Sequence, residues 1–266
     1  MTKAMKYLND VNYKDCVGKL CKSLNSGDFK ILKYNGAKNV EIQFLKTGFK
    51  TSVQLINIKS GSIKDSYIPS VCGVGILGAK YPSKVNGRNT NEYMLWQNML
   101  ERCYSNTNIC DGFKKKNPTY EGCEVSDNFK SYEYFYEWCH EQIGFDNEYW
   151  HLDKDLLVKG NKVYSESTCV FLPREINQLL IKCESLRGEC LIGVSWHKRD
   201  KAFMARVSKN KGGSEWLGYF NTELEAFNAY KVAKESFIKE QAEKWKSQID
   251  ERAYNALMNY TVEITD

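Results

Sequence analysis

The sequence predicts a multidomain α+β protein: a small β-barrel-like N-terminal domain, a mixed central domain, and a C-terminal three-stranded sheet packed on one helix. Its 266 residues are enough for two or three small domains. Apolar residues alternate with polar ones in short stretches of residues 1–80, as in half-buried strands. In residues 81–186 the spacing of apolar residues is mainly that of helices, and in residues 187–266 it is again that of strands, followed by a helix. We take these three ranges as the domains.

The composition is that of a folded protein, with 42% hydrophobic and 27% charged residues. The sequence holds no run of eighteen apolar residues and begins without the apolar core of a signal peptide. We therefore expect a soluble, cytoplasmic protein that does not bind membranes. None of the ten cysteines forms a Cys-x-x-Cys pair, which favours reduced thiols. The alternative, on irregular spacings, is a zinc site of Cys103, Cys110, Cys123 and Cys139 with His140.

Charge is unevenly distributed along the chain, although the net charge is only +5. Residues 1–80 hold 13 lysines, no arginine and 5 acidic residues. Residues 81–186 hold 12 basic and 16 acidic residues, and residues 187–220 hold 7 and 3. Basic ends around an acidic centre suit a protein that grips a polyanion at two places. A solvated basic surface would produce the same distribution.

The N-terminal domain is predicted from residues 29–34 and 40–44, which alternate apolar with polar and flank the turn Asn35-Gly36. A further strand is expected at 53–55. We expect a curled sheet or small barrel with lysines on its outer face. Such a surface could hold nucleic acid or a protein partner.

Residues 73–78 match the glycine pattern of dinucleotide-binding loops. That pattern requires a helix directly after it, whereas Tyr81-Pro82-Ser83 breaks the chain. We therefore reject a nucleotide site, expect no small-molecule cofactor, and assign residues 79–91 to a linker.

Two aromatic-rich helices are predicted for the central domain, at residues 91–104 and 129–142. Their apolar stripes, which we expect in the core, are Tyr93, Trp96, Met99 (or Leu100) and Cys103, and Tyr132, Phe135, Tyr136 and Cys139. Strands at 151–155 and 169–172 follow, and Pro173 suits the first position of a helix. The result is a β-β-α unit.

The C-terminal domain is predicted to contain strands at 192–196, 203–208 and 215–220, followed by a helix capped by Asn221 or Thr222. The helix stripe is Leu224, Phe227, Tyr230, Ala233 and Phe237. Phe203, Ala205 and Val207 should pack on this helix, which leaves Met204, Arg206 and Ser208 on the outer side.

Gly193-Val194, Ala205-Arg206-Val207, Trp216-Leu217-Gly218-Tyr219-Phe220 and Glu225-Ala226-Phe227-Asn228-Ala229-Tyr230 resemble the Apetala-type domain of plant ethylene-response factors. Phage and homing-endonuclease proteins carry the same domain. The resemblance implies a sheet whose outer face lies in the major groove of double-stranded DNA. The residues that the resemblance places at or near DNA are Ser195, Trp196, His197, Lys198, Arg199, Arg206, Ser208 and Trp216. Arg206 is expected to reach a base edge, whereas Ser195 and Ser208 stand where arginine is common, so base preference does not transfer.

The central domain resembles HNH nucleases of phage and homing type. The likeness lies in residues 152–155 and 164–169, and in the upstream residues 102–104 and 135–138. It implies a phage-encoded protein acting in a bacterial host, with a Mg²⁺ or Mn²⁺ ion held by Asp153 and by Asn177 of the helix. Lys154 falls at the position of the general base, and Thr168 at that of the asparagine that orients it.

A lysine at the base position departs from the family, because activation of water at neutral pH suits histidine. Strand alternation puts His151, Asp153 and Asp155 on one face, so His151 is one candidate base. Alternatively, Lys154 contacts the phosphate while a water or Asp155 accepts the proton. The leading hypothesis is a metal-dependent HNH endonuclease that cuts or nicks duplex DNA. The alternatives are a non-catalytic DNA-binding regulator or anti-defence protein with a degenerate site and, less favoured, a zinc-stapled protein-interaction module.

Overall fold

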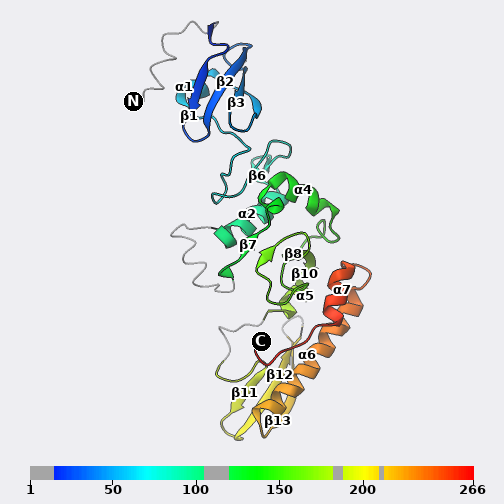
Figure 1. Cartoon of the computed structure of the whole chain (residues 1–266). Coiled ribbons are helices and arrows are strands. Elements are labelled where there is room, and N and C mark those ends of the chain that lie inside the picture. Colours follow the sequence, from blue (N-terminus) through cyan, green and yellow to red (C-terminus); the bar gives the residue numbers. More distant parts are fainter. Residues whose placement is uncertain (1–14, 105–119, 182–187, 210–212) are drawn as a thin grey trace. The chain divides into compact units, whose positions relative to one another are not determined.

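The computed structural model describes residues 15–104, 120–181, 188–209 and 213–266, which form an α+β protein with several small sheets (Figure 1). The chain divides into two compact units. The first comprises Met1–Thr119 with Asp127–Tyr136, and the second Tyr120–Ser126 with Glu137–Asp266. Each unit is described by itself.

The first unit begins with a four-stranded antiparallel meander followed by helix α1 (Leu55–Ser60). Its strands are β1 (Leu20–Ser23), β2 (Gly27–Tyr34), β3 (Val40–Phe44) and β4 (Lys50–Val53). The core is formed by Phe29, Ile31, Val40, Ile42 and Phe44 from the sheet with Leu55, Ile58 and Ile63. In this described part, β1 and β4 are edges, so the meander is an open sheet. The strand expected at 53–55 ends at Val53, because Leu55 opens α1 and turns its side chain into the core.

An aromatic core occupies the rest of the first unit. It joins α2 (Asn91–Tyr104) to a 3-10 turn (Asn128–Lys130) and to the start of α4 (Tyr132–Glu141). Trp96 is fully buried and donates from Nε1 to the carbonyl oxygen of Phe129 at 2.8 Å. The predicted helix 91–104 is confirmed, and the second begins later than expected because residues 128–130 form the 3-10 turn.

Close packing around Gly75 explains part of the glycine pattern at residues 73–78. A Cβ atom there would lie 2.5 Å from Leu100 Cδ1 and 2.9 Å from the Trp96 ring. Because both neighbours are buried, a side chain at this position would disturb the core. Close packing therefore accounts for this glycine without a nucleotide. The short hairpin of β5 (Lys84–Val85) and β6 (Arg88–Asn89) lies in the predicted linker.

The second unit contains the predicted β-β-α arrangement. Strand β8 (Trp150–Asp153) pairs antiparallel with β10 (Val170–Pro173), and α5 (Arg174–Leu179) follows. Two shorter strands, β7 (Glu124–Val125) and β9 (Val163–Tyr164), pair in parallel. Pro173 is the N-cap of α5 rather than its first helical residue.

The C-terminal sheet consists of β11 (Val194–His197), β12 (Ala202–Ser208) and β13 (Ser214–Phe220), in that order and antiparallel. It packs on the first part of α6 (Glu223–Trp245), as predicted (Figure 1). Val194, Ala205 and Val207 are buried against the helix. Leu224 departs from the expected stripe: it is 54% exposed, and Ala226 is buried in the helix's first turns.

Helix α6 contributes to two hydrophobic cores. Ala226, Phe227 and Tyr230 pack on the C-terminal sheet. Farther along, Ile238 and Ala242 pack on the β-β-α unit together with α7 (Glu251–Met258). One helix thus supports both the C-terminal sheet and the β-β-α unit. No helix in the described parts of the chain is long and apolar enough to cross a membrane.

Candidate functional site

The C-terminal sheet presents one face to α6 and the other away from it. Cross-strand partners share a face, so the buried pair Val194–Ala205 identifies the helix side. The opposite side, which we name the outer face, carries Ser195, His197, Ala202, Met204, Arg206, Ser208, Ser214, Trp216 and Tyr219. Ser195, His197, Arg206, Ser208 and Trp216 were predicted for this surface.

A bulge determines which residues of β13 reach the outer face. The register shifts between Ala205 and Arg206, so that Arg206 is opposite Trp216 and Met204 is opposite Tyr219. Leu217 is the extra residue and packs toward the helix side. Residues three apart point to opposite faces in a regular strand. Because of the bulge, Trp216 and Tyr219 lie on the same face. The sequence reasoning missed Tyr219, although Gly218 inside a strand was a signal of a bulge.

Trp196 does not share this face. It is opposite Phe203, and the two rings make an edge contact with centroids 4.8 Å apart. Alternation along β11 puts Trp196 on the same side as the buried Val194. Its ring is 47% exposed at the end of the sheet. The expected grouping of Trp196 with Arg206 and Trp216 is thus wrong for Trp196, and Tyr219 stands beside Trp216 in its place.

Aromatic side chains form an exposed group on the outer face. Trp216 is 57% exposed and Tyr219 44%, and their ring centroids are 5.6 Å apart. His197 lies next to them, with its ring centroid 5.3 Å from that of Tyr219. Exposed aromatic groups of this kind are typical of binding surfaces, because large rings supply contact area at low entropic cost.

The turn between β11 and β12 carries the exposed cations Lys198, Arg199 and Lys201. Asp200 organises it: Arg199 Nε donates to Oδ1 at 3.0 Å, and His197 Nδ1 lies 3.1 Å from Oδ2 without hydrogen-bond geometry. The hydrogen bond from Arg199 and the nearby His197 and Tyr219 lower the pKa of the Asp200 carboxyl. One carboxylate is thus embedded among three cations at one end of the outer face.

The second candidate site lies on β8 and α5. His151 Nδ1 is 3.2 Å from Asn177 Nδ2, so the structure brings together the predicted base and the predicted helix ligand. With the Asn177 amide donating, His151 Nδ1 is the acceptor and Nε2 carries the proton. With the amide turned over, Nδ1 would donate and Nε2 would have the lone pair that a general base needs.

Asp153 closes a turn at the end of β8. Its Oδ1 accepts hydrogen bonds from the backbone N–H groups of Asp155 at 2.9 Å and Leu156 at 2.8 Å. Burial raises the pKa of the Asp153 carboxyl, against the effect of these two bonds. Asp155 lies beyond the strand's last residue, so the alternation that was to place it beside His151 and Asp153 does not extend to it.

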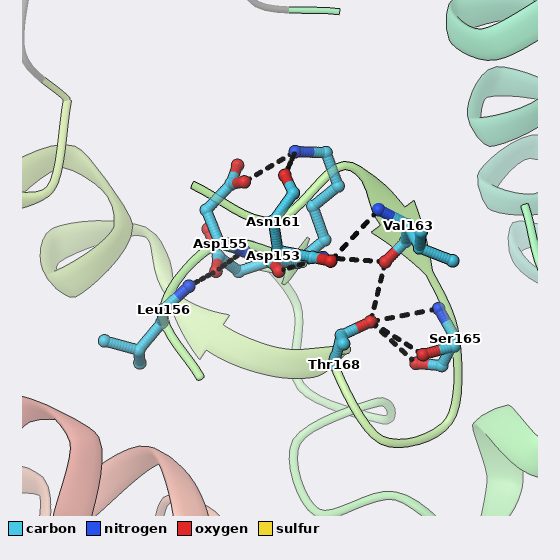
Figure 2. Close-up of polar contacts among 8 residues, drawn as sticks. Asp153, Asp155, Leu156, Asn161, Val163, Ser165 and Thr168 are labelled. Carbon is cyan, nitrogen blue, oxygen red and sulfur yellow. Dashed lines mark hydrogen bonds and ion pairs between the residues drawn. The ribbon is translucent and has the colours of Figure 1, made fainter. Parts of the chain in front are cut away.

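Thr168, Asn161 and Val163 belong to a structural network (Figure 2), and Lys154 takes part in it through its hydrogen bond to Asn161. Lys154 is 5% exposed, and its Nζ donates to Asp155 Oδ1 at 2.6 Å and to the Asn161 carbonyl at 3.0 Å. Asn161 Nδ2 returns hydrogen bonds to the carbonyls of Lys154 and Val163, each at 2.7 Å. Thr168 Oγ1 donates to the same Val163 carbonyl at 2.7 Å. Through these hydrogen bonds, the side chains of Lys154 and Thr168 stabilise the loop between β8 and β10.

At β8 and α5, the described acids and histidines are too few for a metal site made of such protein ligands alone. In the ranges that the structure describes, no three or more His, Cys, Asp and Glu side chains are grouped so that they could hold an ion. Asp153 supplies one carboxylate, and one of its oxygens already accepts two backbone bonds. Of the proposed zinc ligands, Cys110 lies outside the described residues, and Cys103, Cys123 and Cys139 are buried thiols.

Comparison of the chain with protein-family models, with curated proteins and with solved structures found no match. We therefore infer the function from the residues and their geometry.

Proposed function

We propose that this chain binds duplex DNA and places the outer face of its C-terminal sheet in the major groove. The observation that carries the proposal is the exposed group of Arg206, Trp216 and Tyr219 on the face opposite α6. The major groove is about 12 Å wide, admits β-ribbons, and presents the guanine acceptors that an arginine contacts in bidentate fashion. Lys198, Arg199 and Lys201 at the edge of this face are suited to phosphates. The resemblance to Apetala-type domains supports the same orientation.

Fluorescence anisotropy with labelled random duplexes tests this function. We expect the double variant Arg206→Ala/Trp216→Ala to bind about 10-fold to 100-fold more weakly, because a base contact and an aromatic contact are lost. Lys239→Ala, which removes an exposed cation from α6, is the matched control and should bind nearly as wild type does. Neutralising Lys198, Arg199 and Lys201 should reduce the slope of log affinity against log salt by about 3. Absence of duplex binding at low salt, or equal binding by the double variant, contradicts the proposal.

A second candidate is hydrolysis or nicking of duplex DNA in the manner of HNH endonucleases. The proximity of His151 to Asn177 favours it, whereas the structural bonds of Asp153 and Lys154 favour a degenerate site in a non-catalytic regulator or anti-defence protein. Supercoiled plasmid incubated with Mg²⁺ or Mn²⁺ separates the two. Nicking that His151→Ala and Asp153→Ala abolish supports the nuclease. Intact plasmid under both metals, with duplex binding retained, supports the regulator.

A further inference from the structure

The outer face is poor in charge and rich in apolar surface at its centre. Met204 and Tyr219 are cross-strand partners, and Trp216 lies 5.6 Å from Tyr219 between ring centroids. Among the described residues of β11, β12 and β13, Arg206 is the one Lys, Arg, Asp or Glu on this face. Three further cations, Lys198, Arg199 and Lys201, lie in the turn between β11 and β12. A duplex on this surface therefore meets Met204, Trp216 and Tyr219, the His197 ring beside Tyr219, and one guanidinium.

Apart from the half-buried His197, whose ring lies beside that of Tyr219, the remaining outward side chains are small. Ser195 continues the row of Met204 and Tyr219 onto β11, and Ser208 is opposite Ser214. Hydroxyls accept or donate and so discriminate weakly among bases. Their small size leaves Met204, Trp216 and Tyr219 as the prominent apolar contacts, which concentrates discrimination on these residues.

Each base pair offers a different group to such a surface. The thymine C5-methyl is the apolar feature of the unmodified major groove, and guanine O6 and N7 are the acceptors that suit arginine. An apolar side chain gains nothing from the exposed N4 amine of cytosine or N6 amine of adenine, because it would strip water from a donor without replacing the hydrogen bond. Met204 has a flexible, polarisable thioether that adapts to a methyl group.

We propose that the outer face reads thymine methyl groups through Met204, Trp216 and Tyr219, next to one guanine read by Arg206. This inference rests on the proposed duplex-binding function and specifies its substrate: duplexes that present thymine methyl groups in the contacted major groove. The phosphate contacts of residues 198–201 add affinity without sequence preference.

Replacement of thymine by deoxyuridine tests the inference, because it removes one methyl group and no hydrogen-bonding group. Duplexes bound by the full chain are first selected from a random library, and the best is remade with deoxyuridine in one strand or both. Loss of each contacted methyl should weaken binding about fourfold. Met204→Ala should bring the ratio of thymine to deoxyuridine affinity toward one, whereas Met204→Leu should keep it. Arg206→Ala should retain the ratio and lose the preference for guanine.

The possible outcomes distinguish failure of the methyl-reading inference from failure of the proposed duplex-binding function. A chain that binds the selected duplex equally with thymine and deoxyuridine is a DNA-binding protein for which the methyl-reading inference is wrong. The same holds if selection returns sites without thymine. A chain that binds no duplex contradicts the proposed function itself. Thermal melting of each Met204 variant shows that the sheet is folded.

Discussion

Gly193, just before β11, shows how one residue fixes the C-terminal sheet on its helix. Its φ is +76°, and a Cβ there would lie 2.1 Å from Tyr230 Cδ2. Tyr230 is buried in the core between the sheet and α6. An alanine would therefore suffer both a left-handed backbone conformation and a clash with a ring that packing holds in place.

Gly193→Ala is accordingly expected to lower the free energy of unfolding by about 2–4 kcal/mol. Urea denaturation followed by tryptophan fluorescence measures the loss. Gly188→Ala is the control, since nothing lies within 4 Å of a Cβ at that position. Equal stability of the two variants would show that Tyr230 moves aside freely.

Asp250 caps α7 and gives a pH dependence. Its Oδ1 accepts from the backbone N–H of Arg252 at 2.7 Å, and Arg252 Nη2 lies 2.9 Å from Oδ2. Burial alone would raise the pKa of the Asp250 carboxyl, but the hydrogen bonds from Arg252 outweigh it and the net pKa is lowered. A carboxyl whose pKa is lower in the folded state stabilises the protein above its unfolded value of about 4, and this contribution is lost as the pH falls through the folded-state pKa.

We therefore predict that Asp250→Asn is less stable than wild type by about 0.5–1 kcal/mol at pH 7. The difference should shrink as the pH falls below about 4, where the unfolded carboxyl binds a proton, and should be lost once the pH is below the folded-state pKa. Chemical denaturation at several pH values between 2 and 7 gives the comparison. A difference independent of pH would assign the effect to the amide's geometry rather than to the lost charge.

The sequence predicts the orientation of a side chain when a local pattern determines it. It does not predict the role of a side chain when contacts with residues farther along the chain determine it. Alternation along β12 was enough to predict that Arg206 and Ser208 face away from the helix. The loop-fastening bonds of Lys154 and Thr168 depend on Asn161 and Val163, which fold back from the other side of the loop. No local pattern in the sequence indicates such a network, because its partners lie several residues away along the chain.

At the scale of elements, the start of α6 was predictable because its signal is local. Thr222 Oγ1 accepts from the Glu225 backbone N–H at 3.2 Å, and Glu225 Oε2 accepts from the Thr222 N–H at 3.1 Å. This reciprocal capping box needs only four consecutive residues. The bulge in β13 was missed, since a strand read alone gives no register against its neighbour.

Thr222→Ala should cost about 1 kcal/mol of stability, because one orphan N–H of α6 loses its acceptor. Thermal or urea unfolding monitored by circular dichroism provides the measurement. Thr265→Ala, at an exposed position outside any helix, serves as the control and should change stability little. If both variants unfold alike, the capping box contributes nothing to α6.

At the scale of the second unit, α6 joins two cores that share no other long helix among the residues that the structure describes. Tyr230 belongs to the core under the C-terminal sheet, and Ile238 belongs to the core under the β-β-α unit. Ser236 lies between them and is exposed. The two cores are expected to unfold together as long as this helix is continuous.

Ser236→Pro should break this link, at a cost of about 3 kcal/mol or more, because proline removes a helical hydrogen bond and clashes with the preceding turn. We expect the single unfolding transition of the second unit to separate into two. Ser236→Ala retains the helix and should retain the single transition. One unsplit transition of unchanged midpoint in the proline variant would show that the cores are coupled by other contacts.

The segment after α7 has a consequence for synthesis of the protein. Tyr260 packs against both cores of the second unit, and Val262 is buried under the C-terminal sheet. Lys231 Nζ donates to the Val262 carbonyl at 2.6 Å, and Lys159 Nζ lies 2.9 Å from Asp266 Oδ1. The ribosome makes these residues after all the strands that they cover. A nascent chain stopped before Val262 therefore lacks one buried side chain of the core under its sheet, which leaves apolar surface open to proteases.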